Sequence, residues 1–89
     1  MAAPLPTDVL EDDIAVSLAR VMAAANKRAR ELGVDVVQSV ITITQLPSNG
    51  SLFWRINYGP KDHVGRRGGD LVLEVDASDA RVRRVQWGQ

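Results

Sequence analysis

The sequence predicts an α+β domain in which one N-terminal helix packs on a four-stranded antiparallel sheet, in the order helix, strand, strand, strand, strand. Apolar residues recur at steps of three and four over residues 8–32, and the period changes to two after residue 36. Short turns separate most of the alternating segments, and strands joined in this way pair antiparallel. The helix must bury its apolar face against the sheet, because no other element offers it cover.

The helix is expected over residues 8–32. Thr7 or Asp8 is the predicted N-cap, and Asp8 with Glu11 fits a capping box. Gly33 directly follows the last periodic residue and is the predicted C′ glycine. The apolar stripe consists of Leu10, Ile14, Leu18, Val21, Ala25, Ala29 and Leu32.

A second row on the helix consists of Ala15, Ala19 and Ala23. Small residues four apart let another element approach closely, so this row is a candidate helix interface. Alanine is also the strongest helix former, and helix propensity alone is the alternative explanation.

Alternation of apolar and polar residues predicts strands at residues 36–46, 51–58, 70–76 and 80–87. Asn49 and Gly50 favour positive φ and predict a tight hairpin turn between the first two. The residues expected to face the helix are Leu52, Trp54, Ile56, Tyr58, Leu71, Leu73 and Val75.

The last strand carries three arginines. Arg81 and Arg83 are expected on one side of it and Arg84 on the other. We expect these arginines to pair with nearby acids, because opposite charges on neighbouring strands attract. The nearby acids are Glu74, Asp76 and Asp79.

The segment 59–69 is predicted to be a long glycine-rich loop. It connects two strands, so it lacks the helix N-terminus with which glycine-rich phosphate loops bind anions. Arg66 and Arg67 could still hold a carboxylate or phosphate, and a solvated loop without a ligand is the alternative.

Size and composition exclude several functions. The 89 residues suffice for one domain, predicted over residues 7–89 after a flexible arm at 1–6. Eleven basic and eleven acidic residues balance, which argues against a dedicated nucleic-acid binder. The chain has no cysteine and one histidine, so it lacks a thiol nucleophile and a common zinc ligand set. We expect no catalytic residue, metal or cofactor.

The sequence also predicts a cytoplasmic protein. No apolar run approaches the ~20 residues that a membrane-spanning helix needs. The acidic stretch 1–13 has neither the basic nor the apolar region of a signal peptide, and we expect no membrane contact.

These features together predict a small non-catalytic protein-binding or inhibitory module that self-associates. Its partner is a second copy of the chain, another protein, or both. A net charge of −2 over residues 1–35 and +2 over residues 36–89 favours association between copies. Trp87 packs within the monomer or in an interface, where tryptophan is frequent among hot-spot residues. The predicted partner-binding residues are Phe53, Arg55, Lys61, His63, Arg66, Arg67, Val72 and Trp87.

Two alternatives remain open. A small-ligand-binding protein or an enzyme, with a site shared between subunits, would use Arg55, Tyr58 and His63. A weak nucleic-acid binder would use the three C-terminal arginines, although the neighbouring acids oppose this and nucleic acid is not an expected partner.

The C-terminal hairpin at residues 71–85 reads LVLEVDASDARVRRV, with Val75, Asp76 and Ala77 before the turn and Val82 and Val85 after it. A helix followed by strands that end in such a hairpin resembles the PepSY domain family. PepSY domains are short α+β modules, often propeptides or inhibitory modules that act beside peptidases. The resemblance implies a binding or inhibitory role without catalysis.

Overall fold

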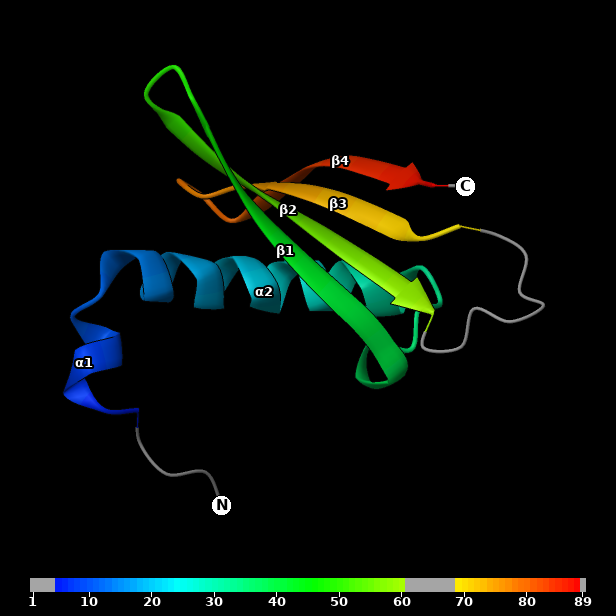
Figure 1. The fold of residues 1–89 in the computed structure, drawn as a ribbon, viewed down its shortest axis with the longest axis horizontal. Coiled ribbons are helices and arrows are strands. Elements are labelled where there is room, and N and C mark those ends of the chain that lie inside the picture. Colours follow the sequence, from blue (N-terminus) through cyan, green and yellow to red (C-terminus); the bar gives the residue numbers. More distant parts are fainter. Residues whose placement is uncertain (1–4, 61–68, 89) are drawn as a thin grey trace.

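A computed structural model of the chain describes residues 5–60 and 69–88. A short helix α1 (Thr7–Leu10) precedes the main helix α2 (Asp13–Glu31), and a 3₁₀ turn η1 (Val36–Gln38) leads into the sheet. The strands are β1 (Ser39–Ser48), β2 (Ser51–Pro60), β3 (Leu71–Asp76) and β4 (Arg81–Trp87). They form one antiparallel sheet in the order β1-β2-β3-β4, with α2 on one face (Figure 1). The predicted α+β architecture is confirmed, and most of the predicted arm 1–6 lies outside the described residues.

The prediction of one continuous helix is wrong at its N-terminal part, because the helix is interrupted between α1 and α2. Asp12 adopts an extended conformation, with φ −96° and ψ 109°, and its carboxylate accepts a hydrogen bond from the Ala15 N–H at 3.0 Å. Asp12 is therefore the N-cap, whereas the predicted capping box of Asp8 and Glu11 does not form. An Asp side chain that bonds nearby backbone competes with helix continuation, and here this outweighs the apolar period.

The junction between helix and sheet also differs from the prediction. Gly33 has φ +90° and ends the helix as predicted. Residues 36–38, however, form η1 rather than strand, because the Asp35 carboxylate accepts a hydrogen bond from the Gln38 N–H at 3.3 Å. The first strand therefore begins at Ser39.

The β1–β2 hairpin has the predicted two-residue turn. Asn49 and Gly50 have φ of 44° and 80°, the positive values that a type I′ turn requires. β2 extends to Pro60, two residues into the predicted loop 59–69, because Gly59 still pairs with Val40 of β1.

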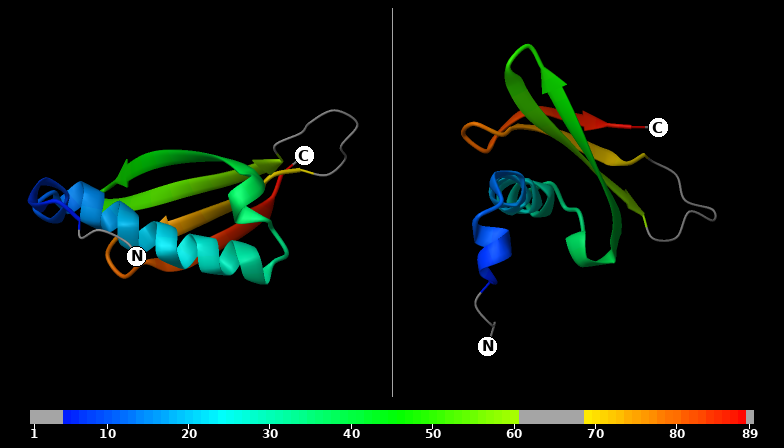
Figure 2. Two further views of the ribbon diagram at one scale, coloured as in Figure 1. Left: turned by 90° about the horizontal axis from the view of Figure 1, so that it is seen from below. Right: turned by 60° about the vertical axis from the view of Figure 1, so that its left-hand side comes forward.

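The core lies between α2 and the central strands. The three buried residues of α2 form one cluster with the inward-facing residues of β2 and β3. All the residues predicted to face inward on these two strands are buried except Leu52, which is half-buried. This cluster contains Val21, Ala25, Ala29, Val36, Trp54, Ile56, Tyr58, Leu71, Leu73 and Val75. A helix is about 10 Å across and strands lie about 4.8 Å apart, so one helix covers only two or three strands. In agreement, α2 packs on β2, β3 and β4, and β1 is the strand farthest from it (Figure 2).

A β-bulge between β3 and β4 changes the side of the strand on which the arginines of β4 lie. Glu74 pairs with Arg84, whereas the next residue, Val75, pairs with Val82, so one extra residue lies on β4. Asp76 then pairs with Arg81. Because Glu74 and Asp76 share a face, Arg81 and Arg84 also share it, and the predicted separation of these two arginines is wrong.

Candidate functional site

The sheet face opposite α2 is open in the described part of the chain and carries three of the predicted partner-binding residues. Phe53 and Val72 are half-buried there, and Arg55 is exposed. The Arg55 guanidinium donates two hydrogen bonds to Oε2 of Glu74 on the neighbouring strand, at 3.2 and 3.3 Å. This face is therefore a mixture of short apolar stretches and ion pairs.

Two of the three C-terminal arginines, Arg81 and Arg83, pair with acids as predicted, whereas Arg84 is in no ion pair among the described residues. Arg83 lies 2.6 Å from Oδ2 of Asp79 and 3.6 Å from Oδ2 of Asp76. Arg81 is 4.0 Å from the same Asp79 oxygen. Because two of its three arginines are paired with acids, this strand offers little excess positive charge to a phosphate backbone.

Trp87 lies on the other side of the sheet from Phe53 and Val72. It pairs with the buried Leu71, so both side chains point towards the helix-bearing face. The indole of Trp87, on the outermost strand β4, is 55% exposed. Val85, two residues earlier on the same face, is also exposed. The structure thus divides the predicted surface between two faces.

The alanine row lies off the core-facing side of α2. Ala19 and Ala23 are exposed and Ala15 is half-buried, whereas Val21 and Ala25 are fully buried. The row is accessible to another molecule, as the predicted interface requires.

Four of the predicted partner-binding residues cannot be placed. Lys61, His63, Arg66 and Arg67 lie outside the described residues.

Two residues of the ligand-binding alternative, Arg55 and Tyr58, lie on opposite faces of the sheet, and the third, His63, lies outside the described residues. Tyr58 is 2% exposed beneath α2, and its hydroxyl donates a hydrogen bond to Asn26 Oδ1 at 2.8 Å. Burial raises the pKa of Tyr58 to about 12, although Arg30 acts in the opposite direction. Arg55 is three residues away on the same strand, and therefore projects from the opposite face.

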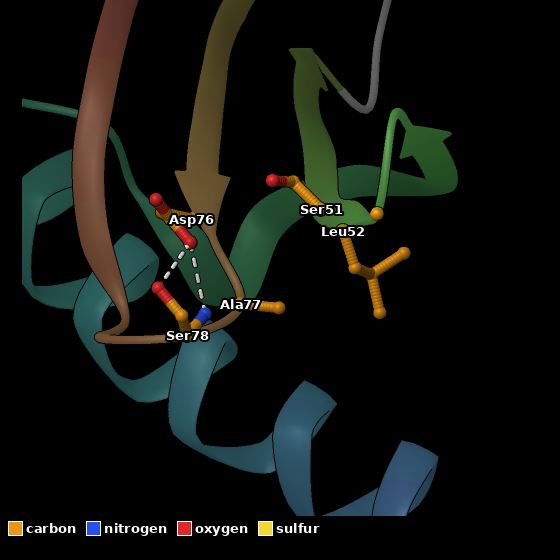
Figure 3. A pocket seen from close by; sticks show the side chains of 6 residues that line it. Ser51, Leu52, Asp76, Ala77 and Ser78 are labelled. Carbon is orange, nitrogen blue, oxygen red and sulfur yellow. Dashed lines mark hydrogen bonds between the residues drawn. The ribbon is translucent and has the colours of Figure 1, made fainter.

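A shallow pocket of about 330 Å³ lies between the β1–β2 and β3–β4 turns (Figure 3). Its charged group is the carboxylate of Asp76, whose Oδ1 accepts hydrogen bonds from the Ser78 hydroxyl at 2.7 Å and the Ser78 N–H at 2.9 Å. These bonds, and then Arg83, lower the pKa of Asp76. The Asp76 carboxylate thus stabilises its own turn, and no cluster of convergent polar groups for a ligand accompanies it among the residues that line the pocket.

Sequence reasoning missed the exposed side chains of β1. Val40 is 52% exposed, and Ile43, which shares the helix-bearing face with the core residue Ile56, is 40% exposed. A signal for them was present, because residues 36–54 contain no charged side chain. The pattern predicts a strand at residues 36–46, but it does not indicate that this strand forms an edge of the sheet.

Comparison with known proteins gives no match: no protein-family profile matches the sequence, and no curated protein or solved structure is significantly similar to it. None of the helices in the described part of the chain is long and apolar enough to cross a membrane. The function is therefore inferred from the geometry.

Proposed function

We propose that this protein is a small non-catalytic protein-binding module with Trp87 as its main contact residue. The observation that carries the proposal is a large aromatic side chain that is 55% exposed on a well-paired strand. Tryptophan buries a large area on binding, and it is enriched among residues that dominate binding energy.

The backbone around Trp87 is held in place before any partner arrives. Trp87 pairs with Leu71, and the N–H of Gly88 donates a hydrogen bond to the carbonyl oxygen of Asp70 at 2.6 Å. An indole on an ordered strand loses little conformational entropy when it is buried. The exposed Val85 beside it widens the apolar contact. The fitting partner is a protein with an apolar pocket that accepts the indole ring.

The resemblance of the hairpin at residues 71–85 to PepSY domains supports the same reading, because those modules bind or inhibit other proteins. This hairpin carries both Trp87's strand and the strand that holds it. The resemblance implies a binding or inhibitory role without catalysis.

The proposal is tested by photo-crosslinking from position 87 in the source cells. A benzophenone amino acid replaces Trp87 in one variant and Lys27, an exposed residue of α2, in the control variant. We expect a protein adduct from position 87 that position 27 does not give. The purified partner should then bind Trp87→Ala at least about tenfold more weakly than the wild type and Lys27→Ala normally. Equal binding by Trp87→Ala and wild type, or no adduct specific to position 87, would refute the proposal.

A further inference from the structure

The two edges of the sheet differ in how they resist pairing with another strand. The β4 edge carries Arg81, Arg83 and Arg84 and contains the bulge, which are devices that discourage edge-to-edge association. The ten-residue β1 edge has neither charge nor bulge in its pairing with β2. It is rich in Val, Ile and Thr, the residue types that favour pairing in sheets.

No described residue pairs with the outer edge of β1, and the hairpin determines which of its backbone groups lie there. The type I′ turn makes Ser48 and Ser51 a hydrogen-bonded pair, and such pairs then alternate along an antiparallel ladder. The N–H and C=O groups of Thr42 and Thr44 therefore bond to β2. The N–H and C=O groups of the odd-numbered residues of β1 point away from β2, towards the outer edge of the sheet. These outward-pointing residues are Ser39, Ile41, Ile43 and Gln45, followed by Pro47, which has no N–H to offer.

The side chains of β1 are also accessible. Val40 and Ile43 are 52% and 40% exposed, on opposite faces of the strand. Thr42, Thr44 and Gln45 are exposed as well. A partner strand would therefore gain apolar contacts on both faces in addition to the backbone hydrogen bonds.

We propose that two copies of the chain pair antiparallel through β1 and form a continuous eight-stranded sheet. A second copy fits because an uncharged strand meets no like charge when it pairs with itself in any register. A twofold axis also places the same free donors and acceptors opposite each other on both strands. This pairing uses a different edge from Trp87 and does not depend on the proposed function.

The register is centred on Thr42, because this choice keeps Pro47 outside the ladder. Thr42 then lies opposite the partner's Thr42, and Ile41 lies opposite the partner's Ile43 on the helix-bearing face. Every hydrogen-bonded pair in this register joins two odd-numbered residues, whose backbone groups are the free ones.

The test uses the full chain in sedimentation equilibrium, with Thr42→Lys as the disrupting variant and Gln86→Lys as its control. Gln86 is exposed and lies at the other end of the same cross-strand row, on β4. We expect wild type and Gln86→Lys to reach twice the 9.7 kDa chain mass. Thr42→Lys should raise the dimer dissociation constant at least about tenfold, since the two introduced ammonium groups lie opposite each other.

Mixing provides a second arm that does not rely on one variant. Thr42→Lys and Thr42→Glu should each dimerise at least about tenfold more weakly than the wild type when alone, and should form a heterodimer when mixed in equal amounts. Amide exchange should show the N–H groups of Ile41 and Ile43 protected only in the dimer, and that of Thr44 protected in both states. A wild type that stays monomeric at millimolar concentration, or a dimer equally stable in both lysine variants, would overturn the proposal. Failure of the mixture to associate would do the same.

Discussion

The hydroxyl of Tyr58 donates a hydrogen bond to Oδ1 of Asn26 at 2.8 Å and so joins the central strand β2 to helix α2. A second bond, from Trp54 Nε1 to Ser17 Oγ at 3.3 Å, joins the same two elements nearer the start of the helix. The apolar core supplies most of the attraction between helix and sheet, but it is not directional. These two polar contacts set the position of α2 along β2.

The Tyr58–Asn26 pair should appear as a coupling energy in a double-mutant cycle. We expect Tyr58→Phe to lower the free energy of unfolding by about 1 kcal/mol, and Asn26→Ala to lower it by roughly 1–3 kcal/mol because it leaves a buried hydroxyl unpaired. The double variant should lose less than the sum of the two. Urea unfolding followed by tryptophan fluorescence measures all four proteins. Strictly additive losses would contradict a direct interaction.

Stability should fall at alkaline pH because of Tyr58. Its pKa is raised to about 12 in the folded state, so above pH 10 the unfolded chain releases a proton that the folded chain retains. This contribution to the free energy of unfolding is complete below pH 10 and is lost as the pH rises to about 12, by roughly 3 kcal/mol in total. Tyr58 is the only tyrosine, so tyrosinate absorbance reports its titration directly. Tyr58→Phe is the control and should show a smaller loss over this interval.

The helix start should depend on Asp12 rather than Asp8. Asp12→Ala removes the cap of α2, and we expect it to lower the free energy of unfolding by about 1 kcal/mol. Asp8→Ala should change stability by less than about 0.5 kcal/mol, because Asp8 is exposed and makes no cap. Equal losses in the two variants would indicate that the helix is continuous through residue 12, as the sequence alone predicted.

The contribution of the β3–β4 turn to the free energy of unfolding should decrease in acid. Hydrogen bonds from Ser78 and the nearby Arg83 lower the pKa of Asp76, so its stabilising contribution is present above the ordinary value of 3.8. That contribution is lost as the pH falls through the lowered pKa. Ser78→Ala should move the pKa of Asp76 back towards 3.8, which an NMR titration of the Asp76 carboxyl carbon measures. An unchanged titration curve in this variant would contradict the assignment of the shift to Ser78.

Local periodicity predicted most of the fold correctly. Leu71, Leu73 and Val75 alternate with polar or half-buried neighbours, and all three are buried. The Asn49-Gly50 turn formed as its preference for positive φ requires. Errors arose where one polar side chain redirected the backbone, as Asp12 and Asp35 do, because a periodic pattern carries no information about such a hydrogen bond.

The candidate surfaces were harder to predict than the fold. Phe53, Arg55 and Val72 lie on the open face as their alternation implies, but Trp87 lies on the other face. The free edge of β1 was not recognised, because its significance depends on strand order. The bulge on β4 likewise has no signal in the alternation of residues 80–87.

The sequence by itself determined whether each main element is a helix or a strand, and which side of each central strand is buried. Both depend on the spacing of apolar residues within a short segment of the chain. The tertiary structure decided which side chains remain exposed. A single helix is too narrow to cover four strands, so α2 lies over β2 to β4 and leaves Ile43 of β1 in contact with water. The surfaces proposed for binding and for pairing lie on the two outer strands, β4 and β1, and no local pattern in the sequence encodes this strand order.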